Sequence, residues 1–211
     1  VTEDQLMAVN LGPVTVDSGA TFRVTQVTGT KDISSKITNN GEVVARLIDA
    51  DVTDLSPDAA SPDGSSVFFA DVDKFEISAG RTLSLSAAQA TGKSTSSVDA
   101  NIVVTAGVAE TQYDFSGLAP TGTGLTTITF DAGTSLSALT TFAAGQFVNV
   151  SAEQVDGLTN YTELNKVEQV TIVDIANTLG ANLEGITADM VIDLESNDAV
   201  LDNAVLKLVG S

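Results

Sequence analysis

The 211-residue sequence contains no histidine, no cysteine and no tryptophan. Histidine and cysteine carry out much of the general acid–base and nucleophilic chemistry of proteins. Mechanisms that need an imidazole or a thiol are therefore excluded for this sequence. Ser and Thr are abundant, but no imidazole or thiolate is present to activate them. Acid pairs are plentiful, yet two Tyr and eight Phe offer few aromatic platforms for a sugar-cleaving cleft. We therefore expect that the protein is not an enzyme.

Basic residues are also scarce. Nine Lys and Arg face 28 Asp and Glu, which gives a formal net charge of −19. Nucleic acids and anionic membrane surfaces are recognised through basic patches, so we expect neither as a partner. No apolar run approaches the roughly 18 residues of a membrane-spanning helix, so we expect no membrane insertion. The lack of cysteine is compatible with an exported protein, and we expect a secreted or cell-surface location.

The sequence does contain many short runs of β-branched residues separated by Gly, Asp, Asn and Ser. Most runs alternate apolar and polar residues, as in Thr127-Ile128-Thr129-Phe130, which is the period of a β-strand. The predicted strands are Val14–Val16, Thr21–Val27, Glu42–Ile48, Val67–Ala70, Lys74–Ile77, Thr82–Leu85, Asn101–Thr105, Gln112–Phe115, Thr126–Phe130, Gln146–Val150, Gln169–Asp174, Met190–Leu194 and Val205–Val209.

Short helical turns and one internal repeat accompany these strands. Residues 79–92 (AGRTLSLSAAQATG) and 144–157 (AGQFVNVSAEQVDG) align at an offset of 65 residues. In each copy a strand runs into a Ser-capped helical turn, Ala87–Ala90 or Ala152–Gly157. A third helical turn is predicted at Ile175–Leu183. A unit of this kind cannot bury its apolar face alone, so stacking against a neighbour is expected.

These patterns predict a mainly β fold: a parallel β-solenoid or other strand-repeat architecture with short helical turns. The alternative is a β-sandwich, or two in tandem. The acidic segment Asp49–Gly64, with Pro57 and Pro62, suggests a division of the chain. We predict an N-terminal β unit over 1–56, an acidic loop over 57–66 and a repeat-bearing β region over 67–211.

The segments VNVSAEQVDGLTN, LSLSAAQATG and VTIVDIANTLGANLEG give this chain a family resemblance. They resemble repeat segments of very large secreted bacterial surface proteins, namely giant adhesins, haemolysin-type exoproteins and S-layer-like proteins. The similar region covers roughly residues 75–211. The resemblance implies an extracellular, repetitive, structural role. The glycine-rich nonapeptide that binds calcium in haemolysin-type proteins is absent from this sequence.

Closely spaced carboxylates make calcium the candidate cofactor. Asp49 and Asp51 lie two residues apart after a predicted strand, so their side chains leave the same face, and Asp54 follows. Asp71 and Asp73 repeat this spacing. Calcium takes six to eight oxygen ligands, which acidic loops can supply. A further acidic group contains Asp193, Glu195, Asn197, Asp198, Asp202 and Asn203.

Self-association is the expected mode of action. A terminal strand, Val1–Gly12 or Val205–Ser211, could add to the sheet of another copy. We expect an extracellular structural protein that assembles with itself into a cell-surface filament, S-layer or matrix, with calcium as a candidate stabiliser. Two alternatives stay open: an adhesin-type module that binds a surface glycan or protein, and a virion structural protein.

Overall fold

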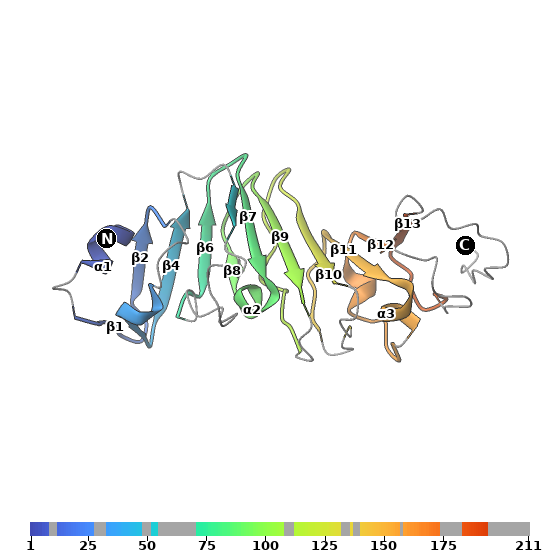
Figure 1. Cartoon of the computed structure of the whole chain (residues 1–211), viewed down its shortest axis with the longest axis horizontal. Helices are drawn as coiled ribbons and strands as arrows, with labels where there is room; N and C mark the ends of the chain where they lie inside the picture. The colour runs from blue at the N-terminus through green and yellow to red at the C-terminus, as the bar shows by residue number, and fades with distance from the viewer. Residues whose placement is uncertain are drawn as a thin grey trace.

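The protein is a parallel β-solenoid of about six turns, seen here in a computed structural model. The structure describes residues 1–8, 12–27, 33–47, 71–107, 112–131, 136, 140–156, 158–173 and 183–193, and the backbone of 52–54. Every strand pairing among these residues is parallel, which excludes the alternative of a β-sandwich built from antiparallel strands. Figure 1 shows the strands side by side along the longest axis of the molecule.

The strands form three sheets. The largest has seven strands in the order β13-β12-β11-β10-β9-β7-β5, the second has the order β2-β4-β6-β8, and β1 pairs with β3. Their bounds are β1 (Val14–Val16), β2 (Thr21–Thr25), β3 (Ile37–Asn39), β4 (Glu42–Leu47), β5 (Val52–Asp54), β6 (Lys74–Ile77), β7 (Thr82–Ser86), β8 (Ser94–Thr95), β9 (Asn101–Ala106), β10 (Thr126–Phe130), β11 (Gln146–Ser151), β12 (Gln169–Val173) and β13 (Asp189–Ile192).

Alternating side chains explain why these short segments stack. In β7, β9, β10, β11 and β12 every second residue points inward, and the strand register places these residues in rows. One row consists of Leu85, Val104, Ile128, Val148 and Val170, all fully buried or nearly so. Each residue in the row lies on the next, so the thin aliphatic core grows by one layer per strand.

Three short helices begin with the same reciprocal cap. In α1 (Glu3–Met7) and α2 (Ala87–Ala90) the capping residues are Thr2 with Gln5 and Ser86 with Gln89. α3 (Ala152–Asp156) repeats the arrangement: Ser151 N donates to Gln154 Oε1 over 2.7 Å, and Gln154 N donates to Ser151 Oγ over 3.2 Å. Such capping boxes satisfy backbone N–H groups that a helix start leaves unpaired. None of the described helices has the length and apolar character required to span a membrane.

The two repeated sequence segments form the same local unit, a strand followed by a capped helix. In the second copy, however, this unit is shifted along the strand direction. Gly80 and Gly145 both adopt positive φ, of 73° and 79°, two residues and one residue before their strands begin. The strand register, however, places Leu85 level with Val148, whereas the 65-residue offset aligns Leu85 with Val150. α3 thus begins two residues further along its strand than α2 does.

Two predictions about segments were wrong. The N-terminal segment Val1–Gly12 was expected to be a terminal strand, but it contains α1, and only Thr2 forms a bridge, to Thr25. Capping by Thr2 favours the helix, and burial of Leu6 holds it against the core. Gln112–Phe115 makes one isolated bridge, Asp114 to Thr141, in place of a strand.

Other predicted segments lie outside the described residues. These are Val67–Ala70, Val205–Val209 and most of Ile175–Leu183. The division into units at 57–66 stays a prediction. The ladder itself continues past that segment, because β4 pairs with β6 on its other side.

Candidate metal site and assembly surfaces

Asp71 and Asp73 come together at one corner of the solenoid, just before β6. Asp73 Oδ2 accepts two hydrogen bonds of 2.7 Å, from Asn39 Nδ2 and from Val43 N. Asn39 Nδ2 also donates to Asp71 O over 2.9 Å. The Asp73 carboxylate therefore joins two successive turns, a role that uses part of its capacity to bind a cation.

The side chain of Lys93 also lies near Asp71 and Asp73. Burial lowers the pKa of Lys93, and the nearby Asp73 and Asp71 carboxylates oppose that shift by stabilising the ammonium form. Across the described ranges, no three Asp or Glu side chains gather into a group able to hold a metal ion.

The remaining predicted ligands are not placed by the structure. Asp49 and Asp51 lie outside the described residues, as does the side chain of Asp54, whose backbone belongs to β5. Of the C-terminal acidic group, only Asp193 is described. Calcium binding stays a prediction.

Asp99 and Asp114 show a structural use of carboxylates that the sequence analysis missed. Asp99 Oδ1 accepts hydrogen bonds from Thr123 N (2.7 Å) and Thr123 Oγ1 (3.0 Å), and both lower the pKa of this carboxyl group. Gly122 is required opposite, because a Cβ at that position would lie 2.1 Å from Asp99 Oδ1.

Asp114 acts in the same way further along the same turn. Its Oδ1 accepts from Ser116 Oγ (2.6 Å) and Thr141 Oγ1 (2.5 Å), and these bonds lower the pKa of Asp114. The partners of both acids lie beyond short-range sequence patterns: Thr123 is 24 residues from Asp99, and Thr141 is 27 residues from Asp114. Carboxylates that join successive turns account for part of the Asp content.

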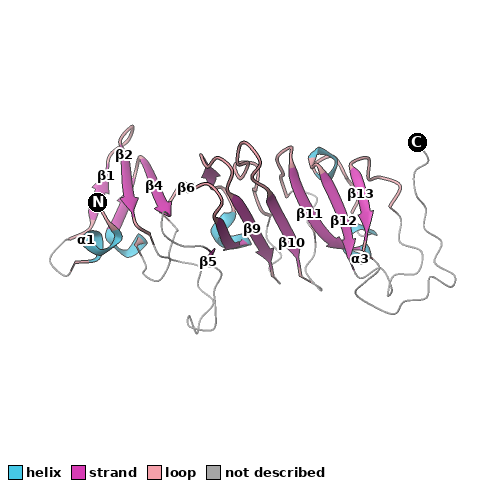
Figure 2. Ribbon diagram, turned by 90° about the horizontal axis from the view of Figure 1, so that it is seen from above, coloured by secondary structure: helices cyan, strands magenta, loops and turns pink. Residues whose placement is uncertain are grey.

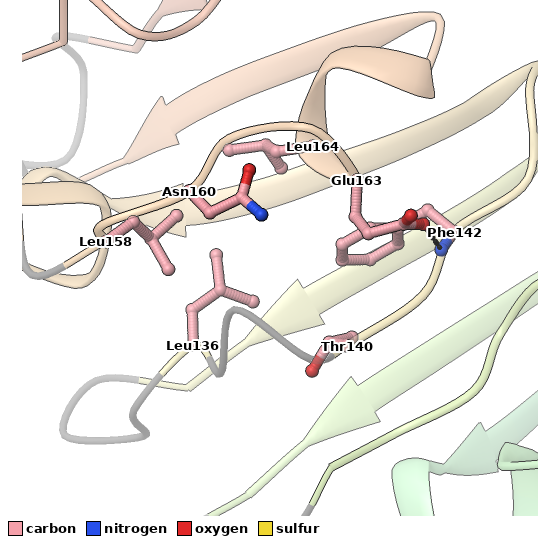
Figure 3. A pocket seen from close by; sticks show the side chains of 7 residues that line it. All are labelled: Leu136, Thr140, Phe142, Leu158, Asn160, Glu163 and Leu164. Carbon is pink, nitrogen blue, oxygen red and sulfur yellow. Dashed lines mark hydrogen bonds between the residues drawn. The ribbon is translucent and has the colours of Figure 1, made fainter.

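A shallow pocket lies between the arc that precedes β11 and the arc that follows α3 (Figure 3). Its volume is about 190 Å³, part of it open to solvent. Its lining residues are Leu136, Thr140, Phe142, Leu158, Asn160, Glu163 and Leu164. Glu163 Oε2 accepts from Phe142 N over 3.3 Å, and the buried Thr140 Oγ1 has no hydrogen-bond partner. Small-molecule sites usually measure about 300–1,000 Å³, whereas the enclosed space here is only about 10 Å³, room for little more than water.

The β13 end of the large sheet is less buried than the strands that precede it. Met190 and Ile192 occupy inward positions level with Val170 and Ile172. The two β12 residues are fully buried, whereas Met190 and Ile192 are only partly buried, and Val191 on the outward side is 45% exposed. This end of the stack is therefore incompletely covered.

At the N-terminal end of the stack, the edge of β2 is covered. Val1 O accepts from Thr25 N over 2.8 Å, so the segment before α1 lies along the edge of β2. α1 then places Leu6 in the core with no exposed surface. The two ends of the solenoid thus differ in chemistry as well as in sequence.

Comparison with known proteins does not place this chain in a family. No protein-family model, no curated protein and no solved structure matches it.

Proposed function

We propose that this chain is a structural protein that assembles with itself outside the cell, into a filament, S-layer or matrix at the cell surface. The observation that supports this proposal best is that the β13 end of the parallel stack is incompletely covered. A strand from another copy, placed beside β13, removes Met190 and Ile192 from water. The cysteine-free composition and the resemblance to bacterial surface-protein repeats support the extracellular location.

Backbone geometry also supports pairing between copies at the β13 edge. Asp193 N donates to Ile172 O over 2.9 Å, so this amide faces β12. Successive amides of a strand alternate in direction, and the N–H of Ile192 therefore points away from β12. An N–H group at a sheet edge is a donor to which a further strand can pair.

The difference between the two ends determines the symmetry of this contact. Because Val1 and Thr2 lie along the edge of β2, next to α1, this strand offers β13 no free edge to pair with. Two copies instead meet through their β13 ends, which is an isologous contact and closes as a dimer. Growth into a filament or layer then requires a second contact between copies. Calcium held by acidic loops is one candidate stabiliser of that growth, and Asp71 and Asp73 are the described residues proposed to contribute.

The test uses Ile192→Pro. Proline removes the outward N–H while leaving the amides that face β12 in place. Ile192→Ala is the matched control, because it shortens the side chain and keeps the N–H. Light scattering coupled to size-exclusion chromatography, over a range of concentrations, should show wild type and Ile192→Ala forming dimers and Ile192→Pro remaining monomeric. A wild-type chain that stays monomeric at the highest concentration, or an Ile192→Pro variant that dimerises like wild type, contradicts the proposal.

A further inference from the structure

The outward side of the large sheet carries a patch without charged residues. Two adjacent rows of outward positions run across β7, β9, β10, β11 and β12, and Figure 2 shows β9 to β12 side by side. We call these ten positions the uncharged face. They are Ser84, Val103, Thr127, Phe147 and Gln169 in one row, and Ser86, Thr105, Thr129, Asn149 and Thr171 in the other. All ten side chains are at least partly exposed.

The ends of the rows mark where this patch stops. In the first row the register continues to Asp54 on β5 and to Asp189 on β13. The outward side of the four-stranded sheet is quite different, since its strands β2, β4 and β6 present Arg23, Glu42, Arg46, Lys74 and Glu76. There Arg23 Nη2 and Glu76 Oε1 form an ion pair of 2.7 Å.

We infer that the uncharged face is a second contact between copies of this chain, an inference that rests on the proposed self-assembly. Each copy carries a net charge of −19, so most approaches of two copies bring like charges together. The uncharged face is a place where two copies can meet without that repulsion. Its partly exposed Val103 and Phe147 side chains add apolar surface to bury.

Part of the polar surface of this face is already ordered. Asn149 Nδ2 donates to Thr129 Oγ1 over 3.1 Å, and Gln169 Nε2 donates to Thr171 Oγ1 over 3.0 Å. Side chains held in this way lose less conformational freedom when a partner docks.

The area of the face decides what this contact can do. Five strands about 4.8 Å apart and two rows about 6.7 Å apart give a footprint of about 300 Å² per copy. A pair would bury about 600 Å², well below the roughly 1,200 Å² of a stable standard-size interface. The contact is therefore weak by itself, and copies paired at β13 join through it into longer assemblies only at high protein concentration. Two isologous contacts on each copy alternate along an open chain, which is a filament.

The experiment compares Thr105→Glu with Thr162→Glu. Thr105 is exposed near the middle of the uncharged face, and Thr162 is exposed in the arc between α3 and β12. Both variants add one negative charge. Electron microscopy and sedimentation at about 0.5 M salt, where repulsion beyond a few ångströms is screened, measure filaments. Size-exclusion light scattering measures β13 dimers.

We expect Thr162→Glu to match wild type in both measurements. Thr105→Glu should keep the dimer and lose at least about tenfold of the sedimentable filament, because the contact would then bury a carboxylate that has no partner. Filaments of Thr105→Glu at wild-type level would overturn the inference and leave the β13 dimer standing. Wild-type dimers that form no filament at any salt concentration would overturn it too. Binding of wild type to an insoluble neutral polysaccharide, lost in Thr105→Glu and without filaments, would assign the face to a glycan in place of a second copy.

Discussion

A polar residue inside the aliphatic core gives the sharpest stability prediction. Gln146 is 1% exposed and makes three hydrogen bonds through its side chain. Its Nε2 donates to Phe115 O (2.8 Å) and Leu118 O (2.9 Å), and its Oε1 accepts from Ala143 N (2.9 Å). Gln146→Leu keeps a similar side-chain size and removes all three bonds.

The loss of stability depends on which hydrogen bonds the former partners of Gln146 keep. Ala143 N, on a half-buried residue, loses its acceptor, which costs at most the roughly 1–3 kcal/mol of an orphaned buried donor. Phe115 O still accepts from Leu118 N, and Leu118 O still accepts from Thr126 Oγ1, so each lost bond there costs about 0.5–1.5 kcal/mol. Extra apolar burial by Leu offsets about 1 kcal/mol. We expect the variant to lose about 2–4 kcal/mol of its free energy of unfolding.

Urea unfolding followed by circular dichroism measures this loss, and Thr126→Val serves as the comparison. Thr126→Val should cost only about 1 kcal/mol, because Leu118 O keeps the Gln146 donor. The double variant removes both side-chain donors to Leu118 O, so its cost should exceed the sum of the single costs by about 1 kcal/mol. A Gln146→Leu variant within about 0.5 kcal/mol of wild type, or a strictly additive double variant, would refute this reasoning.

Three further predictions concern a carboxylate, a glycine and calcium. The hydrogen bonds from Ser116 and Thr141 lower the pKa of Asp114, so its stabilisation is present above the usual carboxyl pKa of about 4 and is lost as pH falls through the lowered value. The urea midpoint of wild type should therefore fall more steeply below about pH 4 than that of Asp114→Asn, and parallel curves would contradict this. A Cβ at Gly117 would lie 2.3 Å from Lys93 O, whereas one at Gly145 (φ +79°) meets nothing within 4 Å. Thermal unfolding should show Gly117→Ala costing more than the roughly 1–2 kcal/mol expected for Gly145→Ala, and equal costs would argue against the close approach. If calcium stabilises the assembly, excess EDTA should disperse wild-type filaments under the electron microscope, and unchanged filaments would remove calcium from the proposal while leaving self-assembly intact.

The sequence predicted those strands that bury one side in a regular alternation. Thr126–Phe130 and Lys74–Ile77 were predicted at their observed bounds, because each strand has two apolar residues at alternate positions that face the core. β8, which is only Ser94–Thr95, has no such pattern, and its place in the sheet comes from pairing with β6. α1 was missed although Thr2 and Gln5 have the spacing of a capping box, a signal that could have located it.

The candidate site was less predictable because its partners are distant in the sequence. The two-residue spacing of Asp71 and Asp73 suggested a pair of free carboxylates at one corner. The hydrogen bond from Asn39, 34 residues before Asp73, depends on how one turn lies on the next. Local patterns carry no information on that placement, nor on the incomplete burial at β13.

The uneven spacing of the strands has a practical consequence. Paired positions lie 19 residues apart from Thr82 to Asn101, 24 from Ile102 to Thr126 and 30 from Val44 to Lys74, yet the ladder stays parallel and in register. The length of the connecting arc is therefore uncoupled from the stacking of the core. Peptides of about ten residues, grafted next to the exposed Thr162 in the arc between α3 and β12, should be displayed at the surface without loss of the fold. The chain could thus serve as a scaffold that presents foreign sequences at one defined position along a rigid axis.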